Sequence, residues 1–68
     1  MKNDERMLLD ELQRQAKEKL PYPREVVRDL CMNEKRAAYI CKKWTKKGWY
    51  DYGVHVLAGW LTPEGMTV

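Results

Sequence analysis

The stretch that decides the fold is residues 33–48, NEKRAAYICKKWTKKG, which carries both a start signal and a stop signal for a helix. Asn33 is a favoured N-cap residue, and Glu34 places a negative charge at the positive end of the helix dipole. Lys46 and Lys47 suit the negative C-terminal end, and Gly48 can adopt the left-handed conformation that commonly ends a helix. The sequence therefore predicts a helix over residues 34–47.

This expected helix has two faces of opposite character. At 100° per residue, Ala37, Ile40, Cys41 and Trp44 fall within about 50° of one direction and form an apolar face. Burying a lysine-lined face against protein would leave charges unpaired, so we expect the other face to meet water or an anion. That face carries, in order around the helix, Lys42, Lys35, Lys46, Tyr39, Lys43 and Arg36.

The charge distribution favours a polyanionic partner for this second face of the expected helix. Residues 1–30 carry equal numbers of acidic and basic side chains, so the net charge of +3 comes from residues 31–68. Solvated helix faces usually mix signs, because opposite charges four residues apart add a little stability. Here lysines repeat without an acid, which favours nucleic acid as the partner. A merely solvated lysine face, or another acidic partner, remains the alternative.

Two further helices are expected upstream. Residues 4–19 repeat apolar side chains at spacings of three and four, and Pro21-Tyr22-Pro23 then breaks the pattern. A short helix over residues 23–31 begins with a proline at a suitable first position. Free cysteine packs like a small apolar residue, so we expect Cys31 and Cys41 to be reduced and in the core. The apolar residues of these two helices are Leu8, Leu9, Leu12, Ala16, Leu20, Val26, Val27 and Leu30.

Downstream, the pattern predicts a β-hairpin over residues 49–62. Residues 49–52 (WYDY) read as a strand, Gly53 permits a turn, and residues 54–62 contain a returning strand. Residues 63–65 (PEG) would close the sheet. We expect Trp44 in the core and Trp49 and Trp60 packed across the hairpin, although stacking of tryptophan on single-stranded bases is an alternative.

The order of these elements resembles the winged helix-turn-helix family, which includes MarR-like regulators and small phage or plasmid regulators. Ala37, Ile40 and Trp44 followed by residues 47–50 (KGWY) are similar to the family's exit from its recognition helix. Residues 60–65 (WLTPEG) resemble the L-T-x-x-G segment that often follows the wing. The resemblance implies an α+β fold of three helices followed by a two-stranded wing, forming a single domain over residues 1–68.

The same resemblance implies a DNA-binding site. The third helix would enter the major groove of double-stranded DNA, and the hairpin would touch the flanking backbone or the minor groove. The residues that would read and anchor the duplex are Asn33, Lys35, Arg36, Tyr39, Lys42, Lys43 and Lys46, with Tyr52 and His55 near the wing. If about five phosphates are neutralised, the logarithm of the affinity should fall against the logarithm of salt concentration with a slope near −4.5.

Other classes of function find little support in the sequence. The spacing of Cys31, Cys41 and His55 is not that of a zinc site, and no glycine-rich phosphate loop is present. The adjacent acids Asp4-Glu5 and Asp10-Glu11 point to different sides of a helix, so we expect them to be solvated. We expect no enzyme activity, no metal and no cofactor.

Length and composition indicate a small globular domain. The chain has 68 residues, of which 44% are apolar, and it lacks both a membrane-spanning run and the apolar core of a signal peptide. We therefore expect a soluble, cytoplasmic protein with no membrane or small-molecule partner. The expected function is sequence-specific binding of double-stranded DNA, as a small phage or bacterial transcription regulator, with a monomer and a homodimer as open alternatives. The alternative is a winged-helix interaction module, or a phage inhibitor, whose basic helix meets an acidic protein or a host nucleic-acid site.

Overall fold

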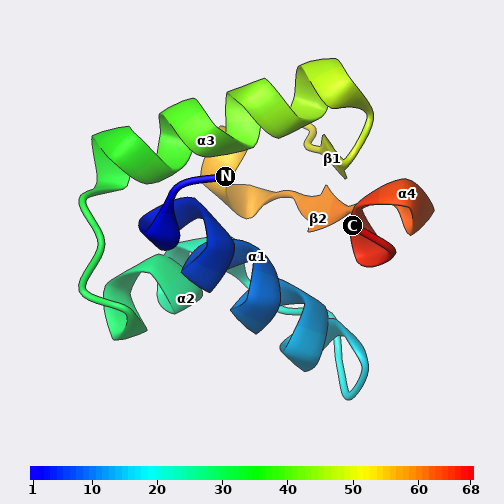
Figure 1. Cartoon of the computed structure of the whole chain (residues 1–68), viewed down its shortest axis with the longest axis horizontal. Helices are drawn as coiled ribbons and strands as arrows, with labels where there is room; N and C mark the ends of the chain where they lie inside the picture. Colours follow the sequence, from blue (N-terminus) through cyan, green and yellow to red (C-terminus); the bar gives the residue numbers. More distant parts are fainter.

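The structure is a computed structural model, which describes all residues 1–68. The chain folds into helices and one small two-stranded sheet. In Figure 1, α3 crosses over α1, and the strands lie beside the C-terminal part of α3 with α4 next to them. The chain is therefore an α+β fold, with one α-helix more than the sequence predicts. The order of elements is α1 (Asn3–Ala16), α2 (Pro23–Asp29), α3 (Glu34–Lys47), β1 (Tyr50–Asp51), the 3-10 helix η1 (Val56–Ala58), β2 (Trp60–Leu61) and α4 (Pro63–Met66).

Helix α3 has the bounds predicted from its end signals. The side chain of Asn33 accepts a hydrogen bond from the backbone N–H of Arg36 at 3.0 Å, which satisfies one of the free donors of the first turn. At the other end Gly48 has a φ of 81°, in the left-handed region that favours glycine. Both capping predictions are confirmed.

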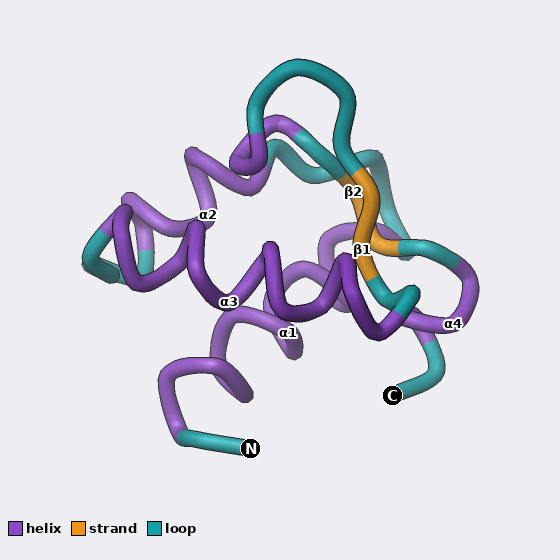
Figure 2. Tube along the Cα trace, turned by 90° about the horizontal axis from the view of Figure 1, so that it is seen from above, coloured by secondary structure: helices purple, strands orange, loops and turns teal.

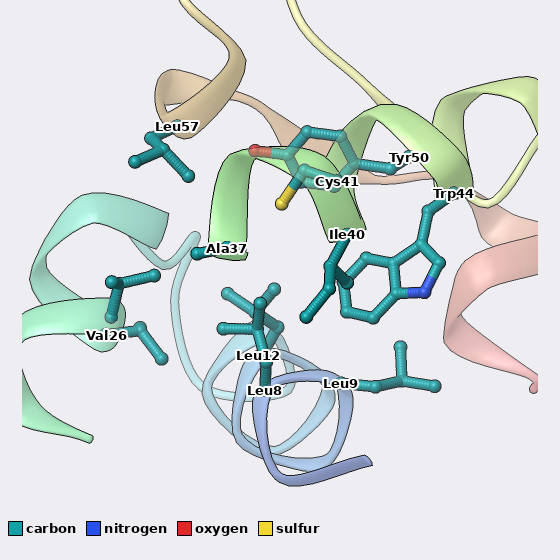
Figure 3. Close-up of a cluster of buried hydrophobic side chains, with 11 residues drawn as sticks. Leu8, Leu9, Leu12, Val26, Ala37, Ile40, Cys41, Trp44, Tyr50 and Leu57 are labelled. Carbon is teal, nitrogen blue, oxygen red and sulfur yellow. The ribbon is translucent and has the colours of Figure 1, made fainter. Parts of the chain in front are cut away.

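The core lies between α1, α2, α3 and the segment that follows α3. Figure 3 shows the side chains of α1 pointing toward Ile40 and Trp44 of α3, with Val26 of α2 to one side and Tyr50 beside Cys41. Each fully buried aliphatic side chain contributes about 1.5–3 kcal/mol to folding. All four residues of the predicted apolar face of α3 are buried, so this prediction is confirmed. The buried apolar side chains are Leu8, Leu9, Leu12, Val26, Val27, Ala37, Ile40, Cys41, Trp44, Tyr50 and Leu57.

Helices α1 and α2 both end earlier than predicted. Helix α1 stops at Ala16 rather than residue 19, and Leu20, expected on its apolar stripe, is 75% exposed. Leu20 precedes Pro21, and a residue before proline is driven out of the helical region. Helix α2 stops at Asp29 rather than residue 31.

Cys31 is exposed, so its predicted place in the core was wrong. It lies just after α2 with a φ of 56°, and its N–H donates to the carbonyl of Arg28 at 3.0 Å. The next N–H, that of Met32, donates to the carbonyl of Val27 at 3.0 Å. This pair of bonds is the left-handed stop usually made by glycine, and it turns the Cys31 side chain away from the core.

The hairpin is confirmed, but its strands are much shorter than predicted. They pair antiparallel, with Tyr50 opposite Leu61 and Asp51 opposite Trp60. The hydroxyl of Tyr50 donates to the carbonyl of Val56 at 2.6 Å and accepts from the N–H of Gly59 at 3.1 Å. Residues 56–58 were expected to lie in the returning strand or just before it. They form the 3-10 helix η1 instead, and the two bonds to Tyr50 flank this helix.

The predicted pairing of Trp49 with Trp60 was wrong. Trp60 lies opposite Asp51 and is 41% exposed, while the half-buried ring of Trp49 is covered by Lys47. The aromatic contacts of the core instead join Trp44 to Tyr50 and Tyr50 to Tyr52, with ring centroids 6.4 Å apart in both pairs.

Residues 63–65 begin a fourth helix rather than closing the sheet. The side chain of Thr62 caps α4 by accepting from the N–H of Gly65 at 3.1 Å, and its hydroxyl donates to the carbonyl of Gly48 at 2.6 Å. The side-chain amide of Gln13 donates to the carbonyl of Gly65 at 2.9 Å. Helix α4 thus joins the end of α3 to α1. None of the helices has the length and apolar composition needed to cross a membrane.

Candidate nucleic-acid interface

The outer side of α3 carries four side chains that lie in solvent, Lys35, Tyr39, Lys42 and Lys46, which we call the basic face. Tyr39 is 58% exposed, and together with Lys42, Lys43 and Lys46 it lines a shallow depression of about 250 Å³. Seen from above in Figure 2, α3 runs along the side of the molecule nearest the viewer. The four side chains of the basic face are therefore accessible to a ligand.

Arg36 lies at the edge of the basic face and is bound to the body of the protein. Its Nε donates to Oδ2 of Asp4 at 2.8 Å, and its Nη2 donates to Oδ1 at 3.2 Å. Hydrogen bonds from Arg36 lower the pKa of Asp4 below its usual 3.8. The expectation that no acid shields the cations of α3 was wrong for Arg36, because the carboxylate comes from α1 rather than from α3 itself.

Lys43 is held in a similar way by Glu5, the second acid of the first turn of α1. Its Nζ donates to Oε1 of Glu5 at 2.8 Å, and the indole N–H of buried Trp44 donates to Oε2 at 2.8 Å. The Glu5 carboxylate is therefore fully engaged, and Lys43 belongs to the contact between α1 and α3. The expectation that the whole lysine-lined face of this helix meets water or an external anion was wrong for Lys43.

Burial works against ionisation of Glu5, but the bonds from Lys43 and Trp44 outweigh it. The pKa of Glu5 is consequently lowered from its usual 4.5, although the residue is only 2% exposed. The expectation of solvated acids at Asp4-Glu5 was wrong, most plainly for Glu5. A signal was present in the sequence, since Glu5 precedes Leu8 by three residues and Leu9 by four, which places it on the apolar stripe of α1.

The two bound cations flank the ring of Tyr39. The Cζ of Arg36 lies 5.6 Å from the ring centroid, and the Nζ of Lys43 lies 6.0 Å from it. Cations at such distances are attracted to the face of an aromatic ring. Contacts from α1 to α3 therefore help to orient the aromatic side chain of the basic face.

Four lysines of α3 form no ion pair, and these are the cations available to a ligand. Lys47 differs from the other three, because its Nζ lies 4.6 Å from the ring centroid of Trp49. All four side chains are exposed. The unpaired lysines are Lys35, Lys42, Lys46 and Lys47.

Near the N-terminal end of α3, the structure brings together residues from three segments. Arg24 of α2 donates to Oε1 of Glu34 at 3.0 Å, and its Nη2 lies 3.0 Å from Nε2 of His55. The Nδ1 of His55 accepts from the N–H of Leu57 at 3.1 Å. His55 is exposed in the connection between the strands, beside the end of α3 capped by Asn33, whose side-chain oxygen serves the cap.

Tyr52, the other residue predicted near the wing, lies in the same connection but faces inward. It is half-buried and packs against Tyr50. Of the two cysteines, Cys41 is enclosed, and burial raises the pKa of its thiol to about 12. Cys41 is therefore a neutral core group at physiological pH.

Comparisons with known proteins give no match. No family model matches the chain, and neither a curated protein nor a solved structure is significantly similar to it.

Proposed function

We propose that the chain binds double-stranded DNA through the basic face of α3, as a small winged helix-turn-helix regulator. The observation that carries the proposal is the sorting of charges around α3. The cations on its α1 side are paired with Asp4 and Glu5, whereas Lys35, Lys42 and Lys46 face solvent around Tyr39 with no carboxylate bound. Such a set of free cations attracts a polyanion.

The dimensions of α3 support the major groove of a duplex as its place of binding. Its 14 residues span about 21 Å, and a helix of ordinary diameter fits this groove. Lysines along the exposed side would contact phosphates or guanine edges, and Tyr39 would contact base edges or a thymine methyl group.

The order of elements also supports a winged helix-turn-helix arrangement. A short connection, residues 30–33, joins α2 to α3, and a two-stranded antiparallel hairpin follows α3. In this proposal α3 is the recognition helix and residues 52–59 form the wing. Regulation would follow from occupancy of a DNA site that polymerase or another protein also needs.

A titration of labelled mixed-sequence duplex at several salt concentrations tests the proposal. Four unpaired lysines predict a slope of about −3.6 for the logarithm of affinity against the logarithm of salt concentration. The double variant Lys42→Glu/Lys46→Glu should abolish binding at physiological salt. Its control is Lys17→Glu/Lys19→Glu, which has the same charge change at exposed positions after α1, away from α3 in Figure 1, and should bind much better.

Two results would contradict the proposal. One is the absence of duplex affinity at low salt, which would favour an acidic protein as the partner of the basic face. The other is an equal loss of affinity in the two double variants, which would mean that net charge rather than the basic face drives binding.

A further inference from the structure

We propose that Asp4 competes with DNA for Arg36 and so holds down the affinity of the basic face. This inference rests on the proposed function and adds a residue outside α3 that sets its strength. In it, Arg36 leaves Asp4 for a DNA phosphate or a guanine edge when the duplex binds, and the cost of that exchange weakens every complex that uses Arg36.

The two carboxylates of α1 differ in a way that makes one of them exchangeable. Glu5 is 2% exposed, and both its oxygens are used, one of them by the buried indole of Trp44. If Lys43 left, the buried Oε1 of Glu5 would lose its partner, which is costly for a charged group. The Asp4 and Arg36 side chains are 40% and 30% exposed, so an incoming anion can reach the guanidinium.

The acceptor that Asp4 supplies resembles the acceptor that DNA supplies. Asp4 binds Arg36 through two roughly parallel bonds, to Oδ2 at 2.8 Å and to Oδ1 at 3.2 Å. A phosphate, or the O6 and N7 of guanine, accepts the same guanidinium fork. The exchange therefore replaces two charge-assisted bonds with two others of the same kind, and Arg36 adds less affinity than a free arginine would.

Arg36 lies close enough to the basic face for a duplex bound there to contact its guanidinium. Its Cζ lies 5.6 Å from the ring of Tyr39, which belongs to the basic face. Asp4 itself stays where it is, because Oδ1 also accepts the backbone N–H of Glu5 at 2.7 Å. After the exchange a free carboxylate remains beside the DNA, and its repulsion of phosphate opposes binding further.

Substituting Asp4→Asn, with Asp10→Asn as the matched control, tests this inference. Asp10 is also an aspartate of α1, and it pairs with Arg6 at 3.2 Å on the surface, so both variants change the net charge equally. For Asp4→Asn we expect duplex affinity to rise about tenfold, the size of one charge-assisted contact. The salt slope should steepen by about 0.9, because the carboxylate freed in the wild-type complex takes up a cation that offsets the one released at Arg36, and an asparagine takes up none. Asp10→Asn should change both quantities little.

A second comparison shows whether Asp4 acts through Arg36. In an Arg36→Gln background, Asp4→Asn should raise the affinity much less than it does with Arg36 present, because only the repulsion between the free carboxylate and phosphate is then relieved. Thermal unfolding of each variant verifies that it is folded at the temperature of the titration.

The outcomes separate this inference from the proposed function. If the wild-type chain binds duplex and Asp4→Asn behaves like Asp10→Asn, or binds more weakly, the competition is wrong and the proposed function stands. If neither the wild-type chain nor Asp4→Asn binds duplex at low salt, both are wrong.

Discussion

The carboxylate of Glu5 decides how α1 and α3 meet. It is the one charged side chain in the buried set, and it satisfies both the ammonium of Lys43 and the indole N–H of Trp44. Because Trp44 is fully buried, its N–H has no route to water and needs an acceptor inside the protein. Glu5 thus fixes which cation of α3 is unavailable to a ligand.

Substitutions of Glu5 should separate its two roles. Glu5→Leu leaves the indole N–H unpaired and should lower the free energy of unfolding by about 1–3 kcal/mol. Glu5→Gln keeps an amide oxygen for the indole and should cost less. Urea unfolding at neutral pH measures both, with Glu18→Leu, an exposed position, as the control. Equal stability of Glu5→Leu and wild type would contradict the assigned role.

The same residue should give the fold a dependence on acid. The pKa of Glu5 in the folded chain lies below its usual 4.5, so its ionised form favours the folded state above that pH. This contribution is lost as the pH falls below about 4.5 and Glu5 becomes protonated. Wild type should therefore lose more stability between neutral pH and pH of about 3 than Glu5→Gln does, as measured by urea midpoints. Identical losses would show that folding does not lower the pKa of Glu5.

Among the elements, α2 and α3 end in the same left-handed turn but use different residues for it. Gly48 takes a φ of 81° after α3, and Cys31 takes a φ of 56° after α2. A left-handed φ costs a residue with a side chain about 1–2 kcal/mol. The stop after α2 is therefore strained relative to the stop after α3.

Exchanging residue types at these two turns should move stability in opposite directions. Gly48→Ala should lower the free energy of unfolding by about 1 kcal/mol. Cys31→Gly should raise it by up to about 1 kcal/mol, because relief of strain exceeds the larger chain entropy of glycine. Thermal melting under reducing conditions measures both. A loss of stability in Cys31→Gly would mean that the thiol makes a contact worth more than the strain.

The elements also show which parts of the fold follow from local signals. The apolar face and both caps of α3 depend on residues close in sequence, and the prediction of this helix was confirmed. The hairpin depends on Tyr50 reaching Val56 and Gly59, and a Cβ at Gly59 would lie 2.3 Å from the carbonyl oxygen of Asp51. Such tertiary contacts override the strand preference of residues 54–58.

In the candidate site too, features set by residues close in sequence could be predicted, whereas features set by the packing of α1 on α3 could not. Helical periodicity predicts that Lys35, Tyr39, Lys42 and Lys46 share a side, and the structure has them exposed there. The pairing of Arg36 and Lys43 depends on how α1 crosses α3, which no spacing within α3 contains. The position of Glu5 on the apolar stripe of α1 was the one available signal of that contact.

At the scale of the whole molecule, the fold divides the cations of α3 into two sets. One set ties α3 to α1 through Asp4 and Glu5, and the other lies on the open side of α3 as a surface without carboxylates. Residues 31–68 supply the net charge of +3, and the unpaired lysines of this half all lie on α3. An electrostatic field of this kind speeds association with a polyanion and fades with added salt.

The most direct test of the central claim is a map of the surface that DNA contacts. We would record amide ¹H–¹⁵N correlation spectra of the labelled chain while adding a mixed-sequence duplex at low salt. Binding through the basic face predicts that the largest shifts fall on Lys35, Tyr39, Lys42 and Lys46, with small shifts around Lys17, just after α1. Shifts centred on α2 or the end of α1, with the basic face unchanged, would contradict it.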